Sequence, residues 1–261
     1  MRRGFANPRL VWTAAGAVLV FLYLPLAVMA FFSFNESPHT SLPFTGFTLQ
    51  WYAKLLNNSQ MLQSILNSVY VGLGVVFLST LFGLPAAIAL DRTEFPGKAW
   101  FRRIVLLPIV LPGVITGVSL LLFYVRIGVP LSLNTIILGQ GTGLMCITIT
   151  EVFARLQQVG RRQEEAALDM GANQWELFTR VTLPNISSAL FGAMLITFSI
   201  SFDEIAVTYL LTGRENTLPM QLWSLLRRTA TPDINAVGTL IIVASVILIL
   251  AGTWLSRRKV I

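Results

Sequence analysis

RRQEEAALDMGANQWELFTRVTLP, residues 161–184, separates two long apolar runs of the chain. Its first ten residues favour a helix, and Gly171 can adopt the left-handed conformation that ends one. Asn173 can then cap a second helix, with Glu176 three residues later completing a capping box. Pro184 is expected to stop that second helix just before the next apolar run. The stretch therefore predicts a helix-turn-helix at about 161–184, outside the membrane.

Apolar segments on both sides of this stretch are long enough to cross a membrane. A spanning helix needs about 20 mainly apolar residues at a rise of about 1.5 Å each. Six segments meet this length, at about 11–34, 64–90, 103–125, 136–154, 187–211 and 237–256. The chain is 54% hydrophobic and only 12% charged, which leaves too little polar surface for a water-soluble globule. We predict an all-α membrane protein with six transmembrane helices in a single domain, residues 1–261.

The basic residues predict the orientation of these helices. Of the 19 Lys and Arg residues, fourteen fall in the two termini and the second and fourth loops, and five fall in the alternate loops. Cytoplasmic loops of membrane proteins are enriched in Lys and Arg. Both termini are therefore expected in the cytoplasm, as an even number of spans requires. The same rule explains the net charge of +7 without nucleic acid as a partner.

The residue types present argue against several classes of function. Cys146 is the single cysteine and His39 the single histidine, so no disulfide can form within the chain and no metal site is expected. The G-x-x-x-x-G-K-[ST] pattern of a phosphate-binding loop does not occur. We predict no catalytic residues and no cofactor in this chain, and any ATP must bind to a separate subunit.

The helix-turn-helix also carries a specific pattern: Glu-Ala-Ala, three residues, glycine, nine residues, Ile or Val, one residue, Leu-Pro. The matching residues are Glu165, Ala166, Ala167, Gly171, Val181, Leu183 and Pro184. This pattern resembles the cytoplasmic loop of the permease subunits of ABC importers. Leu90-Asp91-Arg92 and Leu111-Pro112-Gly113 are similar to other parts of that family, whereas Cys146 stands about where its fourth span usually has a proline. Ser201-Phe202-Asp203-Glu204 with Leu218-Pro219 resembles the spermidine/putrescine branch.

The resemblance implies a type I ABC importer permease (MetI-like) fold in the bacterial cytoplasmic (inner) membrane. The helix-turn-helix would be the coupling helix, which sits in a groove of an ATPase subunit. The residues implied in coupling are Glu165, Ala166, Ala167, Asp169, Gly171, Trp175 and Pro184. The implied partners are a second permease subunit of different sequence, two ATPase subunits that hold ATP and Mg, and an external solute-binding protein.

Two adjacent carboxylates, Asp203 and Glu204, fall within the fifth predicted span. An acidic side chain at mid-membrane costs about 2.5–3.5 kcal/mol on insertion scales, so it must face protein or water. On a continuous helix Asp203 would share a face with Val207, and Glu204 with Thr208. One carboxylate could line a path for a cationic solute, with Tyr209 adding a cation–π face. A structural carboxylate paired with an outer-loop arginine is an equally open interpretation.

Two other classes of function fit the sequence less well. A self-sufficient secondary transporter could use Asp203 or Glu204 as a proton relay, but it would not require the helix-turn-helix of 161–184. A membrane-embedded enzyme would need a cluster of nucleophile, base or metal ligands that the sequence lacks. Within ABC importers, the two acidic residues and the branch resemblance favour a polyamine. Opines, amino-acid-like amines and ions remain open as solutes.

Overall fold

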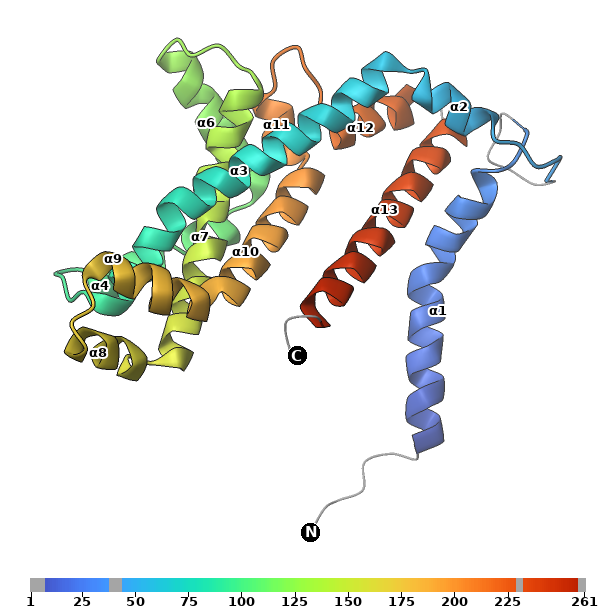
Figure 1. The fold of residues 1–261 in the computed structure, drawn as a ribbon. Helices are drawn as coiled ribbons and strands as arrows, with labels where there is room; N and C mark the ends of the chain where they lie inside the picture. Colours follow the sequence, from blue (N-terminus) through green and yellow to red (C-terminus); the bar gives the residue numbers. More distant parts are fainter. Residues whose placement is uncertain (1–7, 38–43, 229–231, 258–261) are drawn as a thin grey trace. The chain divides into compact units, whose positions relative to one another are not determined.

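The computed structural model describes residues 8–37, 44–228 and 232–257 (Figure 1). In these ranges the chain is helical, apart from turns, loops and one isolated bridge between Asn35 and Phe47. The elements are α1 Pro8–Phe32, α2 Gln50–Leu56, α3 Ser59–Arg92, α4 Lys98–Ile104, α5 Leu107–Val110, α6 Gly113–Arg126, α7 Leu133–Val159, α8 Arg162–Asp169, α9 Gln174–Glu176, the π-helix η1 Leu177–Thr182, α10 Leu183–Asp203, α11 Ala206–Leu211, α12 Leu218–Arg228 and α13 Pro232–Arg257. The all-α prediction is confirmed. His39 and the basic residues at positions 2, 3, 258 and 259 lie outside the described ranges.

Four helices in the described ranges are long and apolar enough to cross a membrane: Val11–Phe32 of α1, α3, α7 and the continuous helix Gln174–Asp203. The pair Lys98–Val110 and Gly113–Arg126 makes a fifth if the two are one bent span. In α13, Asp233–Ile247 is a shorter apolar helix that overlaps the first part of the sixth predicted segment, 237–256. The structure thus supports a multi-pass membrane protein, while six spans and cytoplasmic termini stay predictions.

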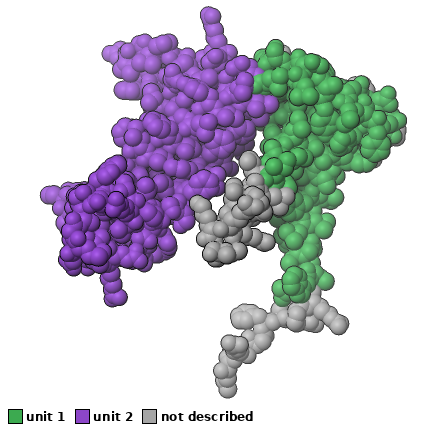
Figure 2. Space-filling model, viewed as in Figure 1, with its two compact units in different colours: residues 1–62, 222–261 green, residues 63–221 purple. Residues whose placement is uncertain are grey.

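The chain divides into two compact units, residues 1–62 with 222–261 and residues 63–221 (Figure 2). In the first unit, α13 packs against α1 and α2. A 2.8 Å ion pair joins Lys54 of α2 to Asp233 of α13, and the Trp51 indole donates to the carbonyl of Asn35 at 2.7 Å. The division does not test the prediction of a single functional domain, which stays a prediction.

The second unit is built around α7, which packs against α10, α11 and α5. One hydrophobic cluster joins α3, α6, α7 and α11 and includes Val75, Ile136 and Leu211, all fully buried. Another joins the other ends of α3 and α7 to the start of α10 and includes Val152 and Ile186. These two clusters set the positions of the loops at either end of α7, including the 161–184 stretch.

The third predicted span, 103–125, is not one straight helix. The helix axes on either side of Leu111 and Pro112 differ in direction by 101°. Leu111 is extended, with ψ of 132°, because a residue before proline is sterically driven out of the helical region. The expectation of one continuous spanning helix through Leu111-Pro112-Gly113 is therefore wrong.

The fifth predicted span, 187–211, is broken as well. The helix α10 ends at Asp203, Glu204 is extended with ψ of 117°, and α11 begins at Ala206. The expected helix faces across this point, Asp203 with Val207 and Glu204 with Thr208, are therefore wrong. Glu204 instead lies one residue before the N-cap, Ile205, and its carboxylate oxygen accepts the backbone N–H of Val207 at 3.1 Å. It caps α11 in the sense that it satisfies an otherwise free N–H of the first turn.

Pro184 does not stop a helix as expected. It occupies the first turn of α10, and the helical chain runs on from Gln174 to Asp203. The six residues before α10 form the π-helix η1. A proline ring clashes with the carbonyl four residues earlier in an α-helix, and a wider π-turn just before the proline relieves that clash. The 161–184 stretch is consequently continuous with the fifth apolar segment rather than separated from it.

Candidate functional site

The turn between α8 and α9 has the geometry that its sequence predicts. Gly171 has φ of +87°, and its N–H bonds to the carbonyl of Leu168 at 2.9 Å. The next N–H, of Ala172, reaches the carbonyl of Ala167 at 3.0 Å, which completes a Schellman motif. Because φ is positive, a residue with a Cβ would be strained at position 171. The glycine therefore sets the direction in which the chain leaves α8.

The capping box at the start of α9 is also confirmed. The Glu176 N–H donates to the Asn173 side-chain oxygen at 2.9 Å, and the Asn173 N–H donates to the Glu176 carboxylate at 3.2 Å. The rings of Trp175 and Phe178 lie on one face, with centroids 6.3 Å apart. Local sequence thus defines the turn at Gly171 and the start of the second arm, whereas the end of that arm differs from the prediction because the helix continues past Pro184.

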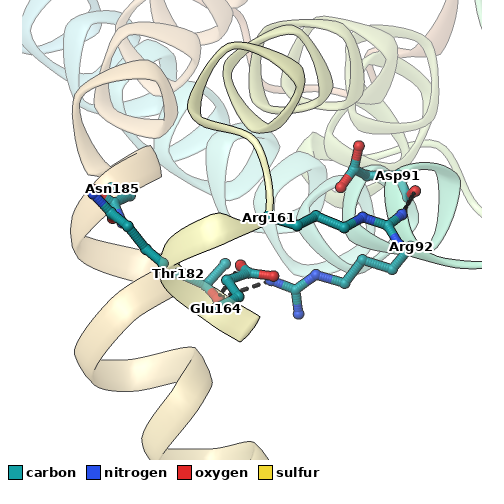
Figure 3. A network of polar contacts seen from close by, with 7 residues as sticks. Asp91, Arg92, Arg161, Glu164, Thr182 and Asn185 are labelled. Atoms are coloured by element: carbon teal, nitrogen blue, oxygen red, sulfur yellow. Dashed lines mark hydrogen bonds and ion pairs between the residues drawn. The ribbon is translucent and has the colours of Figure 1, made fainter. Parts of the chain in front are cut away.

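A network of side chains ties this helix-turn-helix to the end of α3 (Figure 3). The Arg92 guanidinium pairs with Glu164 of α8 and donates to the Thr182 hydroxyl at 2.8 Å. That hydroxyl donates in turn to the Glu164 carboxylate at 2.7 Å. We call Arg92, Glu164 and Thr182 the Arg92 triad. It joins three segments far apart in sequence: the end of α3, α8, and the π-helix that leads into α10.

Further hydrogen bonds reinforce the same junction. Arg161, just before α8, donates to the backbone carbonyl of Asp91 at 2.5 Å, and Gln157 of α7 donates to the Asp91 carboxylate. On the other side, Asn185 of α10 donates to Gln163 of α8 at 2.6 Å. These contacts join α8 directly to α3 and α10, and they join α7 to the same junction through Asp91 at the end of α3.

The outward surface of the helix-turn-helix carries most of the residues predicted for coupling. Glu165, Ala166, Asp169, Gly171 and Pro184 are exposed. Trp175 is 73% exposed, and Met170 beside the turn is 83% exposed. Ala167 differs, because it is 6% exposed and packs inward. Large apolar side chains this open to solvent at a turn are typical of a surface that another protein covers.

Two residues of the Arg92 triad were not identified from the sequence. Glu164 stands beside Glu165 in the quoted stretch, and Thr182 lies two residues before Pro184, yet neither carries a signal of its own. Arg92 was noted only within Leu90-Asp91-Arg92. Glu164 is 72 residues from Arg92, and no local pattern predicts a pair at that separation.

The carboxylates predicted for the solute path lie at the break between α10 and α11. Asp203 is exposed at the end of α10, whereas Glu204 is partly buried and caps α11. Tyr209 is 59% exposed. Thr208 is 1% exposed, and its hydroxyl accepts a hydrogen bond from the Gln140 amide at 2.8 Å, so it is already engaged within the bundle.

Gln140 of α7 spans the break from inside the bundle. Its side-chain oxygen accepts from the Ser201 hydroxyl of α10 at 2.5 Å, while its amide donates to Thr208 of α11. Thr135 adds a bond to the carbonyl of Leu211 at 2.9 Å. The described residues include no group of three or more His, Cys, Asp or Glu side chains that could hold a metal ion.

Sequence comparison finds relatives of this chain among known proteins. A family model described as the binding-protein-dependent transport system inner membrane component matches residues 79–258. The spermidine/putrescine transport system permease protein PotC of Escherichia coli is 28% identical over 244 residues, which cover 93% of this chain and 92% of that protein. The putrescine transport system permease protein PotI of Escherichia coli is 33% identical over 230 residues, which cover 85% and 82%.

Solved structures show the same fold at lower identity. A bacterial alginate ABC transporter, in complex with an alginate pentasaccharide-bound periplasmic protein, contains a chain with a TM-score of 0.72 at 19% identity, covering 96% of this chain and 93% of that one. The MetNI methionine ABC transporter contains one with a TM-score of 0.62 at 20% identity, covering 76% and 95%.

Proposed function

This chain belongs to the family of inner membrane components of binding-protein-dependent transport systems, and from that membership we propose that it forms half of the translocation pathway of a polyamine importer. As a permease subunit of an ABC importer, it is a membrane component of a larger assembly. Six spans with both termini in the cytoplasm complete the proposed topology. The membrane is the bacterial cytoplasmic (inner) membrane.

The helix-turn-helix of 161–184 is the proposed docking site for an ATPase subunit. The observation that carries this proposal is the combination of an exposed face with a tightly bonded base. Met170 and Trp175 are open to solvent, while the Arg92 triad holds the same segment to α3 and α10. A segment built in this way can receive a force at its surface and pass it to the helices that span the membrane.

ATP and Mg belong to the proposed ATPase partners and not to this chain, which we propose is non-catalytic. Two such subunits would close on nucleotide binding and move the 161–184 segments of two permeases. A second permease of different sequence would supply the other half of the pathway. An external solute-binding protein would deliver the solute. Alternating access then follows from rocking of the helices that these segments join.

The proposed solute is a polyamine of the spermidine or putrescine type. Two observations support it: the curated relatives PotC and PotI are named as polyamine permeases, and a carboxylate is available at the break in the fifth span. Of the two acidic residues, Asp203 is proposed to contact the solute because it is exposed. Glu204 is proposed as structural because it caps α11. Tyr209 can add a cation–π contact nearby.

ATP-dependent uptake of spermidine or putrescine into proteoliposomes that contain the whole assembly tests this function. Glu165→Arg should abolish both ATPase binding and uptake. Its control is Glu94→Arg, because Glu94 is an exposed carboxylate that pairs with Lys98, outside the 161–184 segment. If Glu165→Arg binds the ATPase and transports normally, the coupling role is wrong.

The solute path is tested in the same system. Asp203→Asn should keep assembly intact and raise the KM for the polyamine about tenfold, since a hydrogen bond to a charged group contributes about 1.5–3 kcal/mol. Glu204→Gln should change KM less and lower thermal stability more. Unchanged KM in Asp203→Asn would remove that residue from the pathway. Transport by the chain without any ATPase would instead identify a secondary transporter.

A further inference from the structure

A cavity of about 510 Å³ lies between α3, α4 and α7, apart from the carboxylates at the α10–α11 break. Its apolar walls come from Leu90, Val105, Leu106, Ile149 and Phe153. The volume falls in the range of small-molecule sites, about 300–1,000 Å³. The helix-turn-helix is not part of its lining. Neither the coupling role nor the solute path accounts for this cavity.

The polar groups of the cavity are mostly engaged elsewhere. The Thr150 hydroxyl donates to the carbonyls of Cys146 and Ile147 within its own helix, at 2.8 and 3.1 Å. The Gln157 amide donates to the Asp91 carboxylate. The remaining polar group is the Arg102 guanidinium, which lies 4.9 Å from the centroid of the Phe153 ring. In the described part of the chain, no carboxylate is within ion-pair distance of it.

The helical segment that carries Arg102 has the character of a membrane interface. Lys98–Val110 makes an angle of 101° with Gly113–Arg126, so the two helices cannot both run along the membrane normal. Trp100 is 68% exposed, and Arg103 lies over its ring at 5.6 Å. Basic residues interleaved with exposed aromatic ones are typical of a segment that rests among lipid headgroups.

The type of ligand that fits the cavity is indicated by the positive charge of Arg102 and by the apolar walls. Apolar walls favour a hydrocarbon, and an uncompensated guanidinium at the edge favours an anionic group such as a phosphate. A polyamine is disfavoured, because Arg102 would repel it and none of the described lining residues is a carboxylate. We propose that this cavity binds one anionic phospholipid, with its phosphate at Arg102 and an acyl chain along Val105, Ile149 and Phe153.

The leaflet follows from the neighbourhood of the cavity. Gln157 lines it and bonds to Asp91, which also accepts from Arg161 at the start of the helix-turn-helix. Placing the site in the cytoplasmic leaflet therefore rests on the proposed docking of ATPase at 161–184. Anionic lipids attract basic residues at that surface by about 1 kcal/mol each. The lipid would connect the α4 segment to α7 beside the Arg92 triad.

Native mass spectrometry of the whole purified assembly tests the site. The assembly is equilibrated with equal amounts of dioleoyl phosphatidylglycerol and dioleoyl phosphatidylcholine, and retained lipid is counted. Wild type should retain phosphatidylglycerol in preference. Arg102→Gln should lower its retention about fivefold, the change that corresponds to about 1 kcal/mol. Arg103→Gln is the matched control on the same helix, because Arg103 does not line the cavity.

A second variant keeps the test independent of charge. Ala154 is an exposed residue of α7 that lines the cavity, so Ala154→Trp should fill it and displace the lipid without removing a core contact. Equal retention of both lipids by wild type, or unchanged retention in both variants, would overturn the proposal. Loss of an ATPase or permease subunit in Arg102→Gln would show that a protein partner occupies the cavity instead.

The two proposals fail separately. Lipid retention is measured without ATP or polyamine, whereas the proposed function is measured by ATPase binding and uptake. If Glu165→Arg loses uptake but keeps phosphatidylglycerol, the lipid site stands apart from coupling. If Arg102→Gln keeps its lipid while Glu165→Arg behaves as expected, only the lipid site is wrong.

Discussion

Removal of the ion pair in the Arg92 triad should weaken the docking of the ATPase. In the structure, the side chains of Arg92 and Glu164 are 22% and 15% exposed, and Thr182 is 1% exposed. Breaking a fully buried ion pair costs about 3–5 kcal/mol, and an exposed pair contributes about 0–1 kcal/mol. The intermediate exposure of this pair sets its contribution at about 2 kcal/mol, or about 30-fold in an equilibrium constant.

The effect on docking depends on the fraction of molecules in which the triad holds α8 in its observed position. If the ATPase binds only when α8 is fixed, the apparent Kd rises as the fixed fraction falls. Arg92→Ala should therefore raise the Kd of the ATPase for the permease in nanodiscs by up to about 30-fold. Glu164→Ala should act similarly, and the double variant should be little worse than either one.

A double-mutant cycle measures the coupling between Arg92 and Glu164 directly. Its expected value is about 2 kcal/mol. Arg103→Ala is the control, because Arg103 stacks on Trp100 at 5.6 Å and has no part in the triad. Strictly additive effects of the two single variants, or an unchanged Kd in both, would show that the triad does not position α8.

Three further predictions concern stability and are checked by thermal unfolding of the purified assembly. Gln140→Leu should lower stability by about 1–3 kcal/mol, since it removes two buried hydrogen bonds between helices and leaves two hydroxyls unpaired; a neutral result would refute its role at the break. Gly213→Ala should also lower the stability of the assembly, by about 1–3 kcal/mol, because a Cβ there would lie 2.4 Å from the backbone oxygen of Leu131. Its control is Gly143→Ala, where a Cβ meets nothing within 4 Å. This variant should stabilise α7 by about 0.5–1 kcal/mol. Asn173→Ala should cost about 1 kcal/mol and speed hydrogen exchange in the first turn of α9, while equal exchange in both proteins would mean that the cap is dispensable.

Structural features that depend only on residues close together in the sequence were predicted correctly. The turn at Gly171 and the capping box of Asn173 with Glu176 were both expected, and both are present. Each involves residues within a few positions of one another, so propensity and backbone geometry suffice to define them. Four of the long apolar segments, and a fifth as a bent pair, were located for the same reason, because hydropathy is a property of a local window.

Both helix breaks were missed because their causes are only partly local. Leu111-Pro112 was visible as a pair, but a proline within an apolar segment permits either a mild kink or a sharp bend. At Glu204 no proline or glycine marks the break. The two helix ends there are bonded by Gln140, 61 residues from Ser201 and 68 from Thr208, and a single apolar window does not contain such partners.

The sequence by itself determined that this chain is helical and membrane-embedded, and that residues 161–184 form a capped helix-turn-helix with the pattern of an importer permease. Its apolar lengths, its glycine and its capping residues act over one or two helical turns. Only the tertiary structure decided that Arg92 meets Glu164 and Thr182, that Glu204 caps α11, and that Arg102 borders an apolar cavity. In the first and last of these, packing brings together groups from separate helices. In the second, packing maintains the break between α10 and α11, so Glu204 caps α11 and is not part of a continuous spanning helix.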